Sequence, residues 1–157
     1  MQSDEKSKMV WEGLGFPVTL VGYEVKKSRD GEDVPVLNMN EIQEQAFRAL
    51  IVWHSRFTGQ HVRFVRSYLR ETQTEFARNI NQKHPSVVST WEGKADEVTG
   101  MDINTELILR AYMQVTIDGP LFRKGVSNLP WLKFSGLFFD ALKTLQEGEP
   151  LEISKCG

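Results

Sequence analysis

The stretch TQTEFARNINQKHPSVVSTWE, residues 72–92, has the pattern of two short helices joined by a tight turn. Thr72 and Glu75 form a Thr-x-x-Glu capping box, which satisfies two backbone donors at the start of a helix. One apolar face follows at helical spacing, made of Phe76, Ala77 and Ile80. Asn81 tolerates the left-handed conformation that ends a helix, and Pro85 suits the first turn of the next one.

The second helix of this stretch has an inward side and an outward side. Val88 and Trp91 are three residues apart, so both can face the first helix. The other positions carry short side chains that can approach base edges in a DNA groove: Ser86, Val87, Ser89 and Thr90. The pattern also allows an ordinary helical hairpin, in which Val88 and Trp91 only fill a core.

The stretch resembles the DNA-binding unit of the lambda-repressor/Cro-like helix-turn-helix family, also called the xenobiotic-response-element type. The resemblance is carried by Gln73, the triplet Glu75-Phe76-Ala77, Val88 and the pair Trp91-Glu92. Two features depart from the family pattern, since the turn before Val88 is one residue longer and Asn81 stands where a glycine is common. The family implies a mainly α fold, a five-helix Cro-like domain, that places the helix around residues 85–92 in the major groove as a dimer.

A longer part of the chain, residues 13–113, resembles bacterial regulators related to antitoxins of type II toxin–antitoxin systems. The matching motifs are Gly22-Tyr23-Glu24, Val34-Pro35-Val36 and Phe57-Thr58-Gly59. The resemblance implies a transcriptional regulator, a repressor that occludes a promoter, and it allows a toxin protein as partner without supplying the residues that would bind it. Some relatives carry an N-terminal cysteine zinc finger, which is missing from this sequence.

The composition is that of an ordinary globular protein, with 40% hydrophobic and 25% charged residues. Cys156 is the single cysteine, so the sequence offers no disulfide framework and no cysteine-based zinc site. The opening MQSDEKSKMV has no apolar core of signal-peptide length, and no apolar run approaches the roughly 18 residues of a membrane span. We therefore expect a cytoplasmic protein.

The charge is unevenly distributed along the chain. The net charge is −2, but residues 58–94 hold six basic and three acidic residues, which gives this segment +3. The remainder has thirteen basic and eighteen acidic residues, or −5. A locally positive module fits DNA binding with modest non-specific affinity. A solvated helix surface with scattered arginines would explain the same distribution.

Composition changes divide the chain into four parts: a disordered tail at residues 1–9, a β-hairpin and helix at 10–56, the helix-turn-helix domain at 57–115 and a C-terminal helical extension at 116–157. The hairpin is expected to consist of a strand at 16–25, a turn at 26–33 and an edge strand at 34–37.

Four further helices are expected around the central stretch. Asn38 or Asn40 caps a helix at 41–53, whose apolar face forms core or, alternatively, a groove for a partner; it comprises Ile42, Ala46, Ala49, Leu50 and Trp53. Thr58-Gly59 opens the next helix, which buries Val62, Val65 and Leu69. A helix at 103–113 has its apolar side at Leu107, Ile108, Ala111 and Tyr112. After a loop at 120–131, a helix at 135–146 either caps the same core or makes a dimer contact.

The predicted DNA-binding residues are Gln73, Lys83, His84, Ser86, Val87, Ser89, Thr90 and Lys94. The resemblance places Gln73 at a phosphate or base, near the positive end of its helix. Lys83 and His84 lie in the turn and suit phosphates, although His84 serves equally well as a turn residue, and Lys94 is the weaker candidate. Enzyme activity, a cofactor and a metal are not expected, because His54 and His61 lack ligand spacing and no Gly-rich phosphate loop or Gly-x-Ser-x-Gly is present.

A protein-interaction module is the rival hypothesis. In it the helix-turn-helix is only a scaffold, and the N-terminal β element or the C-terminal helix binds a partner. The low net basicity and the short polar side chains of residues 86–90 keep this hypothesis open.

Overall fold

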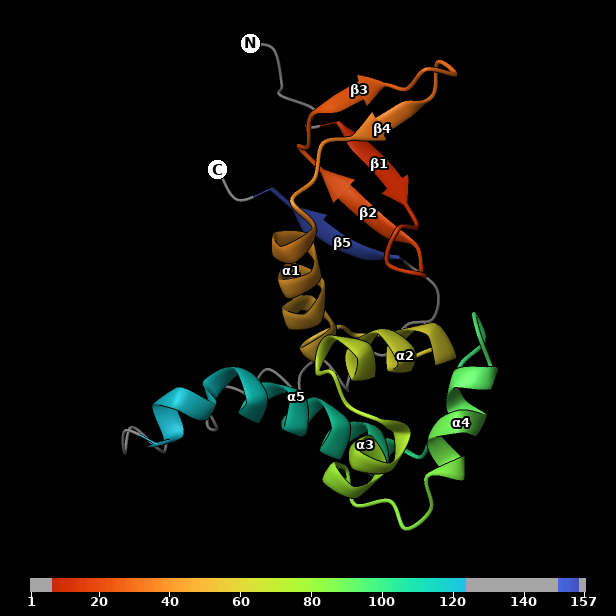
Figure 1. Ribbon diagram of the computed structural model, residues 1–157, viewed down its shortest axis with the longest axis vertical. Coiled ribbons are helices and arrows are strands. Elements are labelled where there is room, and N and C mark those ends of the chain that lie inside the picture. The colour runs from red at the N-terminus through yellow and green to blue at the C-terminus, as the bar shows by residue number, and fades with distance from the viewer. Residues whose placement is uncertain (1–6, 124–149, 156–157) are drawn as a thin grey trace. The chain divides into compact units, whose positions relative to one another are not determined.

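The computed structural model describes residues 7–123 and 150–155 (Figure 1). This part of the chain contains five helices and five strands and is a mixed α/β structure with more helical than strand residues. The strands are β1 (Lys8–Trp11), β2 (Val18–Val21), β3 (Val25–Lys27), β4 (Asp33–Pro35) and β5 (Leu151–Ser154). The helices are α1 (Met39–Ile51), α2 (Gly59–Tyr68), α3 (Gln73–Asn79), α4 (Ser86–Gly93) and α5 (Ile103–Arg123).

The chain forms two compact units, a first unit of residues 1–49 and 150–157 and a second unit of residues 50–149. In the first unit, β2 is the middle strand of a three-stranded sheet, antiparallel to β1 and parallel to β5 (Figure 1). Val18 and Leu20 alternate with the less buried Thr19, and they pair in register with the buried Leu151 and Ile153. This period of two creates one apolar face of the sheet.

The strand β1 corrects the end of the disordered tail predicted at 1–9, because Lys8 and Met9 pair with Val21 and Leu20. The first six residues of that prediction lie outside the described residues. The strand β5 corrects the prediction that residues 116–157 form a helical extension. Residues 116–123 continue α5, and residues 151–154 join the sheet of the first unit. The helix expected at 135–146 and most of the loop expected before it lie outside the described residues.

The predicted hairpin is present but shorter than expected. The expected strand at 16–25 is wrong as one element, because the chain breaks at Gly22, whose φ of 75° leaves the β region. Only β3 pairs with β4, with Lys26 opposite Val34, and Ser28–Glu32 form the connecting turn. The hairpin is thus a separate two-stranded ribbon, whereas β2 belongs to the other sheet.

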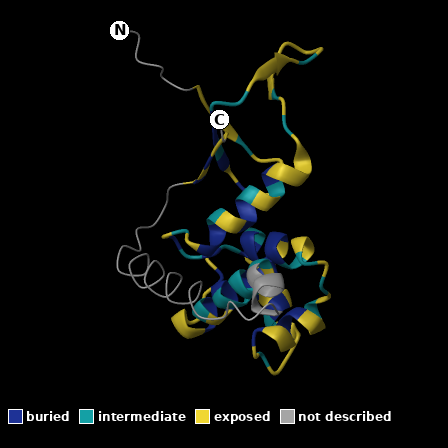
Figure 2. Cartoon of the chain, turned by 90° about the vertical axis from the view of Figure 1, so that its left-hand side faces the viewer, coloured by how far each residue is buried: buried dark blue, intermediate teal, exposed yellow. Residues whose placement is uncertain are grey.

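The helices begin where the capping residues predicted. Asn38 Oδ1 accepts hydrogen bonds from the backbone N–H groups of Asn40 and Glu41 at the start of α1. Thr58 and Thr72 cap α2 and α3, each with a complete capping box. In Figure 2 the helices carry bands of buried and exposed residues, as expected where each helix has one buried face.

The apolar side predicted for the helix at 103–113 is wrong. None of Leu107, Ile108, Ala111 and Tyr112 is buried. The buried residues of α5 are instead Thr105, Glu106, Leu109, Arg110 and Met113. Two of them, Glu106 and Arg110, are charged and form an ion pair. Because apolar spacing counts charged residues as exposed, it assigns both to the solvent side of the helix.

Arg110 is buried in the second unit, with 2% of its surface exposed. Its Nη1 donates to the carbonyl oxygens of Leu50, Ile51 and Trp53, at and beyond the end of α1. Its Nη2 donates to the Ser55 carbonyl (2.7 Å) and to Glu106 Oε1 (3.0 Å). The guanidinium therefore binds five acceptors and satisfies carbonyl groups that a helix end leaves without partners.

The beginning of α2 touches the end of α4 through Gly59. A Cβ atom at this position would lie 2.7 Å from the backbone nitrogen of Ala95 and closer still to the backbone oxygen of Trp91. Gly59 and Gln60 also donate backbone hydrogen bonds to Glu97 and Ala95. Glycine is required here by the close approach of two backbones, which no side chain can relieve by rotating.

We predict that Gly59→Ala lowers the free energy of unfolding by more than about 2 kcal/mol, because two backbones must separate. Gly93→Ala is the matched control, since a Cβ atom there meets nothing within 4 Å. In a helix this control should leave stability unchanged or raise it by up to roughly 1 kcal/mol. Urea unfolding of both variants measures the two free energies of unfolding. Equal changes for Gly59→Ala and Gly93→Ala would contradict the claim that the backbones at Gly59 leave no room for a side chain.

His61 is a buried titratable group, so it makes stability depend on pH. It is buried at the start of α2, where its Nδ1 accepts from the Thr58 backbone N–H at 3.0 Å and its ring lies 4.7 Å from that of Trp53. Burial, with the nearby positive charge of Arg110, lowers the pKa of His61 from 6.5 to about 4. The folded protein therefore holds His61 neutral.

Because the unfolded chain binds a proton at His61 near pH 6.5 and the folded chain only near pH 4, stability should fall as the pH drops through this window. The loss due to His61 alone should approach about 3 kcal/mol. His61→Gln keeps an N3 residue able to complete the capping box. Its unfolding free energy should depend less on pH between 6.5 and 4 than that of the natural protein, and equal slopes in denaturant titrations would refute the assignment.

Candidate nucleic-acid interface

The turn between α3 and α4 is built as its sequence predicts. Asn81 has a φ of 59°, the left-handed conformation, and its neighbour Gln82 donates a backbone hydrogen bond to the Ala77 carbonyl at 2.8 Å. Pro85 is the N-cap of α4, and the backbone N–H of Val88 donates to its carbonyl at 3.0 Å. The two short helices thus form a continuous helix–turn–helix segment within the second unit.

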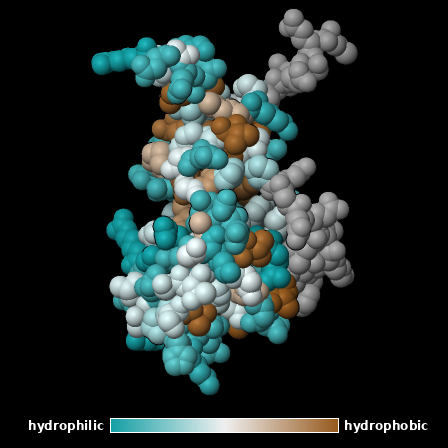
Figure 3. All heavy atoms as spheres, turned by 90° about the vertical axis from the view of Figure 1, so that its right-hand side faces the viewer, coloured by the Kyte–Doolittle hydropathy of each residue, from teal (hydrophilic) through white to brown (hydrophobic). Residues whose placement is uncertain are grey.

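The two sides of α4 differ as predicted. Val88, Trp91 and Glu92 are buried. Ser86, Ser89 and Thr90 are exposed and Val87 is half-buried. Figure 3 views the molecule from the side on which α4 lies in Figure 1, and the surface at that level is mostly pale and teal, with scattered apolar atoms. The outward side of α4 is therefore a surface of short side chains, three with a hydroxyl group and one, Val87, apolar.

The hydroxyl group of Thr90 is engaged within α4. Its Oγ1 donates to the Ser86 carbonyl oxygen at 3.0 Å. This bond uses the only proton of the hydroxyl, so Thr90 has acceptor capacity left but no donor. At a base edge, Thr90 could therefore accept a hydrogen bond but not donate one while this bond is made. Ser89 keeps an exposed hydroxyl that can do either.

Gln73 takes part in a buried ion-pair network that fixes the end of α4. Its Nε2 donates to Glu92 Oε2 at 3.0 Å. Arg66 of α2 donates to both oxygens of the same carboxylate, at 2.5 and 3.2 Å, and to the backbone carbonyl of Glu71 at 2.9 Å. Arg63 lies 3.8 Å from Glu92 as well. One acidic side chain therefore ties α2 and α3 to α4.

This role of Glu92 and Arg66 was not predicted from the sequence. The signal was available, since Arg63 and Arg66 are three apart on one helix and require an acidic partner if their side becomes buried. The structure also limits Gln73, whose amide nitrogen already holds Glu92. Its predicted contact to a phosphate or base has to use the remaining N–H or the amide oxygen.

The predicted basic residues bracket α4 along the chain. Lys83 and His84 are exposed in the turn before it, and Lys94 is its exposed C-cap residue. Glu75 is exposed nearby in sequence, and the Thr72 backbone N–H holds the pKa of its carboxyl below the usual range. That carboxylate is engaged as a cap, as predicted, rather than as a general base.

No family model, no curated protein and no solved structure matches this chain. Within residues 7–123 and 150–155, no three His, Cys, Asp or Glu side chains gather as a metal site. None of the helices in the same ranges has the length and hydrophobicity needed to cross a membrane.

We predict that Glu92→Ala lowers the free energy of unfolding by roughly 3 kcal/mol, because it leaves the half-buried Arg66 without its partner. Ser89→Ala, on the exposed side of the same helix, should change stability by less than about 0.5 kcal/mol. Thermal and denaturant unfolding measure both. A loss for Glu92→Ala as small as that of the control would show that the network does not hold α4.

Proposed function

We propose that this protein is a sequence-specific DNA-binding transcriptional regulator that inserts α4 into the major groove of double-stranded DNA. The observation that carries the proposal is the division of α4 into two sides. Val88, Trp91 and Glu92 anchor one side, while the other presents only short side chains to solvent. The B-DNA major groove, about 12 Å wide, admits a helix of this kind.

The order of α2 to α5 and the capping boxes of α2 and α3 support a Cro-like helix-turn-helix domain as the finer assignment of the fold. In such a domain the helix before the turn lies behind the reading helix and contacts the DNA backbone. Here α3 is short, capped and packed through Phe76, Ala77 and Ile80, and its first residue is Gln73. Lys83, His84 and Lys94 would contact phosphates at the two ends of α4.

A dimeric repressor is the form of regulator that this surface favours. The outward side of α4 has no arginine, asparagine or glutamine among residues 86–90, so one copy makes few strong base contacts. Two copies related by a two-fold axis, with half-sites about 34 Å apart, would combine two weak contacts into tight binding. Occupying a promoter in this way would block transcription from it.

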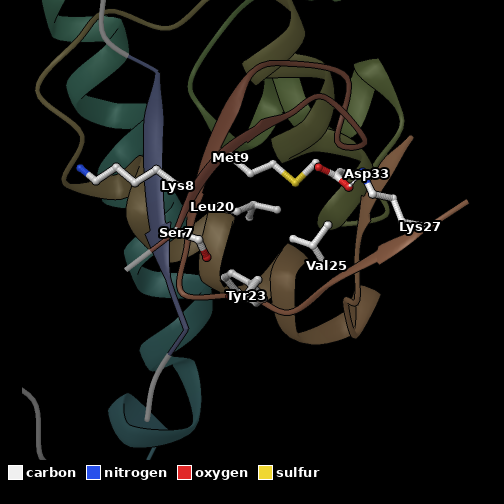
Figure 4. A pocket seen from close by; sticks show the side chains of 8 residues that line it. All are labelled: Ser7, Lys8, Met9, Leu20, Tyr23, Val25, Lys27 and Asp33. Atoms are coloured by element: carbon white, nitrogen blue, oxygen red, sulfur yellow. Dashed lines mark ion pairs between the residues drawn. The ribbon is translucent and has the colours of Figure 1, made fainter. Parts of the chain in front are cut away.

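A second candidate function is favoured by the first unit, where apolar side chains are exposed. Val25, Val34 and Val36 of the ribbon and Met39 at the start of α1 are each more than 40% exposed. A pocket of about 410 Å³ lies beside the ribbon (Figure 4), lined by Ser7, Lys8, Met9, Leu20, Tyr23, Val25, Lys27 and Asp33. This surface suits a protein partner, and a toxin neutralised by an antitoxin-like regulator is the partner class we propose.

We predict that the pure protein binds one DNA sequence more tightly than random DNA, and that binding to both weakens as salt rises. Lys83→Ala should weaken both by a similar factor and reduce the dependence of affinity on salt by about one counterion. Lys155→Ala, an exposed lysine of the first unit, is the matched control and should leave binding unchanged. Titration of the upstream region of its own gene and of random DNA at two salt concentrations tests this.

Equal and feeble binding to every DNA sequence would refute the regulator. Capture of a defined partner that is lost on replacing Val34 and Val36 with serine would then establish the second candidate. These valines are exposed, so the replacement should not unfold the first unit.

A further inference from the structure

The outward side of α4 consists of two chemically different stripes. Ser86 and Ser89 are three residues apart, as are Val87 and Thr90, and residues at this spacing are neighbours on a helix surface. The first stripe presents hydroxyl groups. The second stripe presents an isopropyl group and a threonine whose hydroxyl is turned back to its own helix. The two stripes therefore offer a neighbouring ligand different contacts.

Thr90 is the residue whose role the structure changes. Its hydroxyl donates to the Ser86 carbonyl oxygen at 3.0 Å, and this bond selects a single side-chain rotamer. Thr90 is nevertheless exposed, and its methyl group takes no part in this bond. Val87 is half-buried and β-branched, so its methyl groups are also held in one orientation.

We propose that Val87 and Thr90 together form a methyl-reading pair that recognises the C5-methyl groups of thymines in the major groove. This inference rests on the proposed function and names what α4 reads. Among the four bases only thymine presents a methyl group there, and apolar side chains contact it. Selection of the DNA sequence would thus depend on apolar contact with thymine methyl groups. A bidentate hydrogen bond to a base needs a long side chain, and residues 86–90 have none.

The surroundings of the pair favour DNA as its ligand. Lys94 lies one helical turn after Thr90, and Lys83 lies in the turn before α4, so positive charge occurs at both ends of the stripe. Gly93 adds no side chain to the same side of the helix, and nothing lies within 4 Å of where its Cβ would be. A base edge can therefore approach the pair without meeting a bulky neighbour.

The test replaces thymine with deoxyuridine, which removes only the C5-methyl group and leaves the protein unaltered. The tightest-binding sequence is first selected from random DNA with the full-length protein. Each thymine is then replaced singly, and affinity is measured. We expect one or two positions at which the replacement weakens binding about threefold to tenfold, the effect of losing one buried methyl contact.

Three protein variants assign the contact to its residues. Val87→Ala and Thr90→Ser remove methyl groups, and each should lower the preference for thymine over deoxyuridine at the position that its residue contacts. Thr90→Val keeps the methyl group and removes the hydroxyl, so it should retain the natural preference for thymine. Unfolding curves of the three variants verify that each is folded during the measurement.

The outcomes separate this inference from the function on which it rests. Selective binding in which no thymine replacement changes affinity would overturn methyl reading and leave the regulator intact. A Thr90→Val variant that loses its thymine preference would also overturn it, because the hydroxyl would then be the reading group. Absence of selective binding to any sequence would overturn both proposals together.

Discussion

The arrangement of the second unit depends on the buried guanidinium of Arg110. It donates hydrogen bonds to carbonyl groups at the end of α1 and in the loop that follows. Its charge is balanced by Glu106, one turn earlier on α5. Glu106 in turn accepts the backbone N–H of Phe57 at 3.0 Å and pairs with Arg56. A buried charge costs several kcal/mol unless it is fully paired, so the loop leading to α2 has to keep this conformation.

The position of α4 follows from that loop through a series of close contacts. Thr58 caps α2 directly after the loop, and Gly59 allows the backbone at the end of α4 to approach. Glu92 then ties the buried side of α4 to Arg66 of α2. Two ion-pair networks, rather than an apolar core alone, thus decide which side of α4 remains exposed.

The sequence predicted the features that depend on interactions within a few residues. The start of α2 at Thr58, the capping box at Thr72, the left-handed Asn81 and the start of α4 after Pro85 all appear as expected. Features that depend on distant partners were missed. The strand β5 pairs with β2 across more than a hundred residues, and the buried side of α5 carries charges whose acceptors lie some fifty residues earlier. No local pattern contains that information.

In the proposed site too, the sequence predicted which residues of α4 are exposed but not the hydrogen bonds that their side chains make. Spacing alone identified which of residues 86–90 face outward, because one helix turn determines it. Spacing could not show that the Thr90 hydroxyl donates its proton to the Ser86 carbonyl oxygen. That bond depends on the side-chain rotamer of Thr90, which is selected only once the helix has formed. The consequence is chemical, since Thr90 can accept a further hydrogen bond but can donate none while this bond is made. In the proposed DNA complex, a net charge of −2 and a local excess of +3 would give limited electrostatic affinity, so an apolar contact of defined shape would contribute to the selectivity.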